Sequence, residues 1–318
     1  MALLSQAPPE PHPTVLARAG KFSALPDDIT SVGAGGIGVS SEDLVLRGLD
    51  RLPPFSPILN RLMASLARED VSFRELSDVI EKDTVVAGNL LRLVNSALYG
   101  FSGTVNSVRH AVAILGVMKL RNVVMGMSIS RMWRTVRTPE NWSAARFNIH
   151  SAATAILSDL LVEKLPVPYP EGAFVAGLLH DIGKLLIAIA LPREFALIQT
   201  RFELGGATIG ECELEVIGAT HAALSGAALN RWNLPAPIRR AVSFHHHPDQ
   251  ASQGQLELSH VVHAANQLAN DLGHSALSPD HEQNRHSDEV LAGLGLTDQV
   301  PRLLAQFGPE FETLRSFF

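Results

Sequence analysis

One aspartate and several histidines in the second half of the chain have the types and spacing of metal ligands. His180 and Asp181 stand in the otherwise apolar run "FVAGLLHDIGKLLIA", residues 174–188. Charged groups are rarely placed in such a run unless something compensates them. Neutral imidazole suits zinc, manganese and iron, and a carboxylate adds negative charge for the ion. The run therefore predicts either a metal site or a polar pair that is neutralised locally.

Further histidines with apolar neighbours would have to supply the rest of such a site. Adjacent residues on a helix point about 100° apart, so His180 and Asp181 need ligands from other helices. The candidates, all at helix-like positions, are His150, His221, His245 and His246. The alternative needs no metal, because Asp181 and Lys184 are spaced i,i+3 and can pair. Buried histidines are also commonly hydrogen-bonded core residues, so the spacing leaves both interpretations open.

The composition excludes several classes of protein. The chain has 318 residues, 46% of them apolar and few of them aromatic, which favours helices with an aliphatic core. A formal charge of −6 argues against a general nucleic-acid binder. The single cysteine excludes an internal disulfide and a cysteine-based zinc site. We find neither a signal peptide nor a membrane span, so a cytoplasmic protein is expected.

The apolar periodicity predicts helices throughout and no convincing strand. Residues 1–43, with proline clusters and a glycine-rich stretch, are expected to be a flexible tail. Residues 44–138 form one helical subdomain, 139–272 a second, and 273–318 a polar loop with C-terminal helices. The helices expected in the second subdomain cover 140–164, 171–190, 192–204, 207–217, 219–232, 235–246 and 255–272.

Two motifs add a resemblance to a known family. The string "HDIGK" (180–184), with histidines before and after it, resembles the HD superfamily of metal-dependent phosphohydrolases. The segment "KDTVVAGNLLRLVNSALYG" (82–100) resembles the HDOD domain, and that similarity extends over about residues 44–270. HDOD domains are all-helical relatives of the HD fold. The resemblance implies a bacterial regulatory module that acts through a signalling protein partner. Nucleic acid and membrane are not expected as partners, because of the net charge and the missing membrane span.

The resemblance also implies a set of site residues. A retained HD-like pocket would sense a small ligand or hold one or two ions of Fe, Mn, Zn or Ni. Its metal ligands here would be His150, His180, Asp181, His221, His245, His246 and Asn266. Asn266 stands where the family's last ligand is normally an aspartate, and it carries no charge. The "GYP" motif of the cyclic-di-GMP phosphodiesterases is also missing from this chain. Hydrolysis of a nucleotide or cyclic dinucleotide is therefore the alternative to the regulatory role, and Lys184 would then contact the phosphate. Whether the protein is an enzyme stays open.

Overall fold

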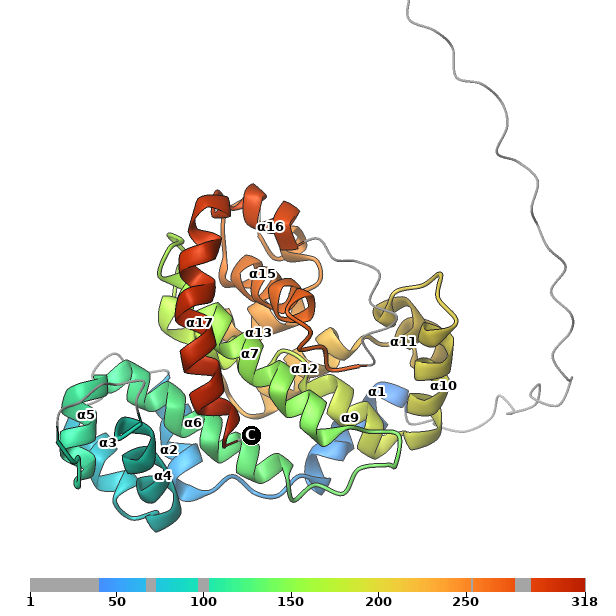
Figure 1. Cartoon of the computed structure of the whole chain (residues 1–318). Helices are drawn as coiled ribbons and strands as arrows, with labels where there is room; N and C mark the ends of the chain where they lie inside the picture. Colours follow the sequence, from blue (N-terminus) through green and yellow to red (C-terminus); the bar gives the residue numbers. More distant parts are fainter. Residues whose placement is uncertain (1–39, 67–72, 97–102, 253, 278–286, 318) are drawn as a thin grey trace, which may run out of the picture. The chain divides into compact units, whose positions relative to one another are not determined.

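Every regular element in the described part of the chain is a helix (Figure 1). The computed structural model describes residues 40–66, 73–96, 103–252, 254–277 and 287–317. The all-helical fold predicted from the composition and the periodicity is thereby confirmed. The flexible tail expected over 1–43 lies mostly outside the described residues. Its last three residues are helical, because the first helix begins at Ser41, capped by the Ser40 side chain.

The first half of the chain forms a bundle of short helices. After α1 (Ser41–Arg47) and the 3₁₀ turn η1 (Gly48–Arg51), the bundle consists of α2 (Pro57–Ser65), α3 (Phe73–Ile80), α4 (Thr84–Val94), α5 (Val108–Leu115) and α6 (Val117–Trp133). Helices α2 to α6 pack mainly on one another. The side chains of Ser56, Asp83 and Ser107 accept backbone N–H bonds at the starts of α2, α4 and α5.

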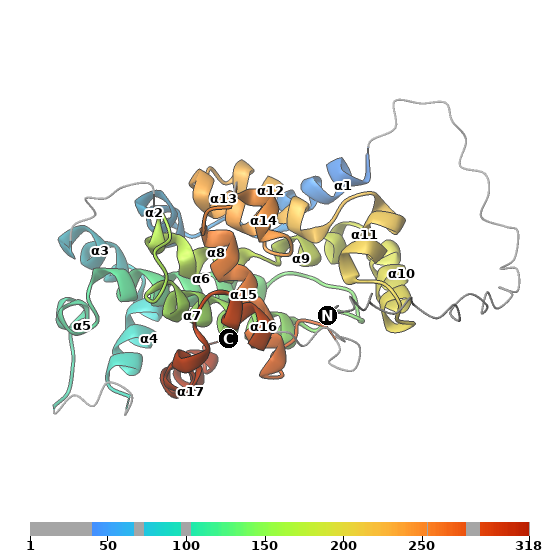
Figure 2. The same cartoon turned by 90° about the horizontal axis from the view of Figure 1, so that it is seen from above.

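The second half surrounds a long buried helix, α7 (Ala144–Val162). Its other helices are η3 (Pro170–Gly172), α8 (Ala173–Leu179), α9 (Ile182–Ala190), α10 (Pro192–Glu203), α11 (Ile209–Ile217), α12 (His221–Arg231), α13 (Ala236–Ser243), α14 (Pro248–Ala251) and α15 (Leu258–Asp271). Helices α8 and α15 pack against α7, and α9 and α13 pack against α12. Figure 2 shows α1 beside α9 and α12, so this short N-terminal helix packs against the second half.

The prediction of a single helix over 171–190 is wrong in one respect. The structure divides it into α8 and α9, with His180 and Asp181 at the break. Asp181 has φ −101° and ψ 9°, outside the helical region. The apolar periodicity continues through the break, which is why it was not visible in the sequence. His180 and Asp181 therefore lie at a junction between helices, where neighbouring side chains can reach one common point.

The same stretch, counted across its break, is long and apolar enough to cross a membrane. It runs from Pro170 to Ala190, and 94% of its most apolar window is buried inside the protein. The bent pair of α5 and α6 passes the same test only if it is counted as one span. Buried core helices have these properties too, so the stretch is weak evidence for a membrane span.

The C-terminal helix joins the two halves. After α16 (Ser287–Gly293) and η5 (Thr297–Gln299), α17 (Val300–Arg315) packs along α7. Glu310 of α17 forms an ion pair with Lys119 of α6, with Nζ and Oε1 2.6 Å apart. The Ser130 hydroxyl of α6 donates to the Phe317 carbonyl at 3.0 Å. Of the polar loop expected before these helices, residues 278–286 lie outside the described residues.

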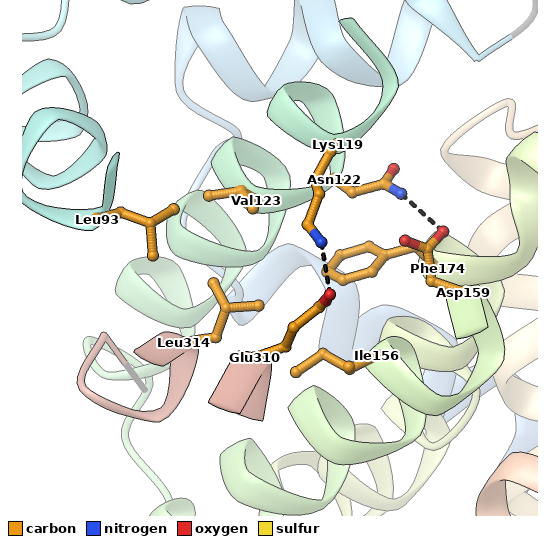
Figure 3. A pocket seen from close by; sticks show the side chains of 9 residues that line it. All are labelled: Leu93, Lys119, Asn122, Val123, Ile156, Asp159, Phe174, Glu310 and Leu314. Atoms are coloured by element: carbon orange, nitrogen blue, oxygen red, sulfur yellow. Dashed lines mark hydrogen bonds and ion pairs between the residues drawn. The ribbon is translucent and has the colours of Figure 1, made fainter. Parts of the chain in front are cut away.

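A small cavity lies where α6, α7 and α17 meet (Figure 3). Asp159 lines it and accepts a hydrogen bond from Asn122 Nδ2 at 3.0 Å. Burial, with repulsion from Glu310, raises the pKa of Asp159 to about 6. Because this pKa is above the unfolded value of 3.8, ionisation destabilises the fold, and the stability present at low pH is lost as the pH rises through about 6.

Asp159→Asn is therefore expected to stabilise the protein at pH 7 by about 2 kcal/mol, because it removes a disfavoured charge and keeps a hydrogen-bond acceptor. Urea unfolding at several pH values measures the gain, which should shrink as the pH falls below 6. Glu140→Gln, at an exposed carboxylate before the same helix, is the control and should change little. A destabilised Asp159→Asn protein, or a gain independent of pH, would contradict the assignment.

Candidate metal centre

Six of the seven predicted ligands come together in the fold. They form two groups of donor atoms that share Asp181, and within each group the donor atoms lie within 4.8 Å of one another. We define the His150 group as His150, His180 and Asp181, and the His221 group as Asp181, His221, His245 and His246. The ligands come from α7, the junction of α8 and α9, the first residue of α12 and the segment after α13. Residues far apart in the sequence therefore meet at one place.

The cluster is buried almost completely. Its aspartate and four of its histidines, at positions 150, 180, 221 and 245, are 0–1% exposed. His246 is partly buried, whereas His247, the last of the histidine triplet, is exposed. The members of the triplet preferred from the sequence, His245 and His246, are thus the two that face the cluster. Buried polar groups need partners, so the cluster must be satisfied either internally or by an ion.

The Asp181 carboxylate faces both groups, with one oxygen toward each. Oδ2 lies 3.3 Å from His150 Nε2 and 3.4 Å from His180 Nε2. Oδ1 lies 3.3 Å from His221 Nε2 and 3.7 Å from His245 Nε2. A single carboxylate can therefore serve as a ligand in either group, or in both at once.

Backbone carbonyls fix the orientation of three of the imidazoles. The Nδ1 atoms of His150, His180 and His245 each lie 2.7 Å from a carbonyl oxygen, and the partners are His274, Gly177 and Val242 in that order. A carbonyl can only accept, so Nδ1 carries the proton, and Nε2 of the neutral ring presents its lone pair to the cluster. This arrangement is typical of metal-binding histidines.

Burial also keeps imidazoles of the cluster uncharged. It lowers the pKa of His180 to about 3, with the Asp181 carboxylate acting in the opposite direction. Burial together with neighbouring histidines holds the pKa of His245 and that of His246 well below the usual range. These rings are therefore neutral at physiological pH, which is the form that binds metal.

Glu213 orients His221 and was not identified from the sequence. Its carboxylate lies 2.7 and 2.9 Å from His221 Nδ1 and accepts the His221 backbone N–H at 2.7 Å. It is only 2% exposed. The sequence does contain an indication that Glu213 is buried, because it occupies a position of the apolar stripe of α11. The other members of this stripe are Ile209, Cys212, Val216 and Ile217.

Several contacts within the cluster are unfavourable unless a cation is present. Asp181 Oδ1 and His245 Nε2 are buried and have no hydrogen-bond partner among the described residues. His150 Nε2 and His180 Nε2 lie 3.1 Å apart, and the carbonyl behind the neutral His180 ring leaves a lone pair on its Nε2. Unpaired buried polar atoms cost about 1–3 kcal/mol each. Imidazole and carboxylate donors with these free atoms fit a divalent ion of the Zn, Mn or Fe type.

The ion pair of the metal-free alternative is present as well. Lys184 Nζ lies 2.8 Å from Asp181 Oδ2. Burial opposes ionisation of Asp181, but the His180 imidazole and the Lys184 ammonium outweigh it and hold the pKa of that carboxyl well below its usual range. The pair uses only Oδ2, and Oδ1 has no hydrogen-bond partner among the described residues. The ion pair therefore satisfies one oxygen of the carboxylate and leaves the other available to an ion.

Two further residues are Gly183, which lies in the "HDIGK" motif, and Asn266, which the sequence analysis gave as a ligand. Gly183 packs α9 onto α12, where its N–H donates to Ser225 Oγ at 2.8 Å, so close packing accounts for this glycine. Asn266 is buried on α15, and its Oδ1 accepts a hydrogen bond from Asn270 Nδ2 at 3.4 Å. Its role as a metal ligand stays a prediction.

Comparisons with known proteins agree with the helical fold. The sequence pattern of the HDOD domain matches residues 52–248. An uncharacterised protein of Treponema pallidum is 25% identical over 225 residues, which cover 69% of this chain and 42% of that protein. The chain thus spans less than half of this relative's length.

Two solved structures are similar over most of the chain. An HDOD domain protein of unknown function from Geobacter sulfurreducens has a TM-score of 0.70 at 22% identity, covering 87% of this chain and 98% of that one. A candidate phosphohydrolase from Shewanella amazonensis has a TM-score of 0.65 at 25% identity, covering 85% and 98%. The first of these likenesses shows the fold alone.

Proposed function

Because this chain belongs to the HDOD domain family, we propose that it is a regulatory module of bacterial signal transduction that acts through a protein partner. In this proposal the His–Asp cluster holds a divalent ion that stabilises the module. The family match supports the regulatory class, and the convergence of six predicted ligands supports the metal. The metal's identity is left to experiment among Fe, Mn, Zn and Ni.

The burial of the ligands is the observation that carries the proposal. Asp181, His221 and His245 are each 0% exposed, so their donor atoms have no open face toward solvent. Catalysis at a metal needs a coordination position that substrate can reach, whereas structural sites are closed by protein ligands. The buried cluster therefore supports an ion that holds helices together.

The protein's own residues would act as anchors for the ion. His150 comes from α7, His221 from α12 and Asp181 from the junction of α8 and α9. Each side chain would be held in place by its backbone carbonyl, glutamate or lysine partner. A bound divalent ion supplies positive charge and Lewis acidity at this point. By joining these helices, the ion would stabilise the packing of α7, α9 and α12.

The second candidate function is a metal-dependent phosphohydrolase acting on a nucleotide or cyclic dinucleotide. Two observations favour it: the similarity to the candidate phosphohydrolase of Shewanella amazonensis, and the partial exposure of His246 at the edge of the cluster. Lys184, one turn from His180, would then neutralise a phosphate oxygen. The uncharged Asn266 and the missing "GYP" motif weigh against this candidate.

An assay for hydrolysis distinguishes the two proposed functions. Metal-loaded protein incubated with nucleoside triphosphates and cyclic dinucleotides is expected to form no product above a control that contains only the metal ion. In the regulatory role, a folded double variant of His180 and Asp181 should keep partner binding and signalling output. Hydrolysis that disappears with Asp181→Asn would establish the enzyme and overturn the regulatory proposal. Loss of signalling output from a fully folded double variant would also overturn the regulatory proposal.

A further inference from the structure

We propose that the two groups of ligands fill in a fixed order: the His221 group takes the first divalent ion, and the ammonium of Lys184 disfavours a second ion at the His150 group. This inference rests on the proposed metal site and adds an order of occupancy to it. It follows from an asymmetry of charge around the shared Asp181 carboxylate.

A second carboxylate stands behind the His221 group. Glu213 is 2% exposed and holds His221 Nδ1 at 2.7 Å, so its negative charge lies one imidazole away from the ligand atom Nε2. A carboxylate in this position raises the basicity of the imidazole and favours a cation beyond it. The corresponding partners of His150 and His180 are neutral carbonyls. The His221 group therefore has one more nearby negative charge.

The Lys184 ammonium acts on histidines of both groups, but its hydrogen bond lies on the side of the His150 group. Lys184 Nζ donates to Asp181 Oδ2 at 2.8 Å, and Oδ2 is the carboxylate oxygen nearest to His150 Nε2 and His180 Nε2. Lys184 is only 6% exposed, so water screens its charge weakly. An ion in the His150 group would share Oδ2 with this ammonium and be repelled by it. The His150 group is thus the weaker site.

The unpartnered atoms lie on the side predicted to fill first. Asp181 Oδ1 and His245 Nε2 both belong to the His221 group and have no hydrogen-bond partner in the described part of the chain. Oδ2, on the other side, already accepts the bond from Lys184. The His221 group also offers four ligand residues against three. Four ligands complete a tetrahedral site, whereas three leave it open.

Titration of the metal-free full-length protein with Co²⁺ tests the order. Calorimetry gives the stoichiometry and affinity of each step, and visible absorption reports the coordination of the ion. We expect a first equivalent that binds at least 100-fold more tightly than the second. His246→Ala should weaken the first step, whereas His150→Ala should remove only the second.

Substitution of Glu213 tests the charge behind His221. Glu213→Gln is expected to weaken the first step about 10–100-fold, the usual effect of removing a partner of a metal-bound histidine. Glu215→Gln removes an exposed charge from the same helix and should leave both steps unchanged. Should Glu213→Gln fail to fold by circular dichroism, Glu213→Asp keeps the charge and should preserve the tight first step.

Substitution of Lys184 tests the repulsion. Lys184→Met is expected to strengthen the second step at least about tenfold, because a buried like charge is removed. Lys164→Met, at the end of α7, removes a lysine charge elsewhere and should have no such effect.

Different outcomes overturn different claims. The order of filling would be overturned if the two binding steps had equal affinity. It would also be overturned if the first binding step were lost in His150→Ala and kept in His246→Ala. Either result would leave the metal site intact. A folded wild-type protein that binds no Co²⁺ would overturn the metal site and the order together.

Discussion

Asp181→Asn protein is expected to bind no divalent ion tightly at either group and to be about 3–5 kcal/mol less stable than the wild type. Both carboxylate oxygens face histidine ligands, so one substitution removes the only negatively charged ligand of both groups. The amide also leaves the Lys184 ammonium without its carboxylate at a 6% exposed position. Removing one partner of a buried ion pair typically costs 3–5 kcal/mol. Metal analysis and urea unfolding of chelator-treated protein measure the two effects separately.

A double variant separates the loss of the ion from the loss of the ion pair. Asp181→Asn with Lys184→Met removes both charges, so it should recover much of the stability of the metal-free protein while still binding no metal. Wild-type metal content in folded Asp181→Asn would show that the carboxylate is not a ligand. Failure of the double variant to recover stability would show that the ion pair is not the source of the loss.

Gly183→Ala is expected to destabilise the protein by more than about 3 kcal/mol and to weaken metal binding. A Cβ built on Gly183 would lie 2.8 Å from the carbonyl carbon of His221 and closer still to its oxygen. Because the obstacle is backbone, helices α9 and α12 must separate, and displacements of this kind are among the severe effects of core substitutions. The movement would also carry the His221 imidazole away from Asp181.

Gly88→Ala is the matched control for this substitution. Gly88 lies inside α4, and a Cβ there would meet nothing within 4 Å. Alanine is the better helix former by about 1 kcal/mol, so this variant should be slightly more stable than the wild type. Thermal unfolding of both variants measures the difference. A Gly183→Ala protein as stable as the Gly88→Ala protein would contradict the close approach of α9 to α12.

The helical fold and most of the cluster could be predicted from the sequence, for different reasons. Apolar periodicity predicts helices because it reflects burial of one face, as in α13, whereas α7 is buried on nearly all sides. For the cluster, His180 and Asp181 stood out as polar residues in an apolar run. Spacing alone left a metal site and a local ion pair open, and the structure contains the geometry of both.

What could not be predicted depends on contacts between distant segments. Neither His180 nor Asp181, the two residues at the break, is a proline or a glycine. The directions of the two helix axes follow instead from the packing of α8 against α7 and of α9 against α12. Glu213 resembles its exposed neighbours Glu211 and Glu215 in type, and only its place in the apolar stripe distinguishes it. Its partner, His221, is eight residues away in the next helix.

The metal content of the protein tests the central claim most directly. Elemental analysis of protein purified without chelator should find between one and two equivalents of Fe, Mn, Zn or Ni per chain, with one equivalent retained after prolonged dialysis. Folded protein that contains no metal, and that takes up none when these ions are added, would show that imidazoles and carboxylate converge here without binding an ion.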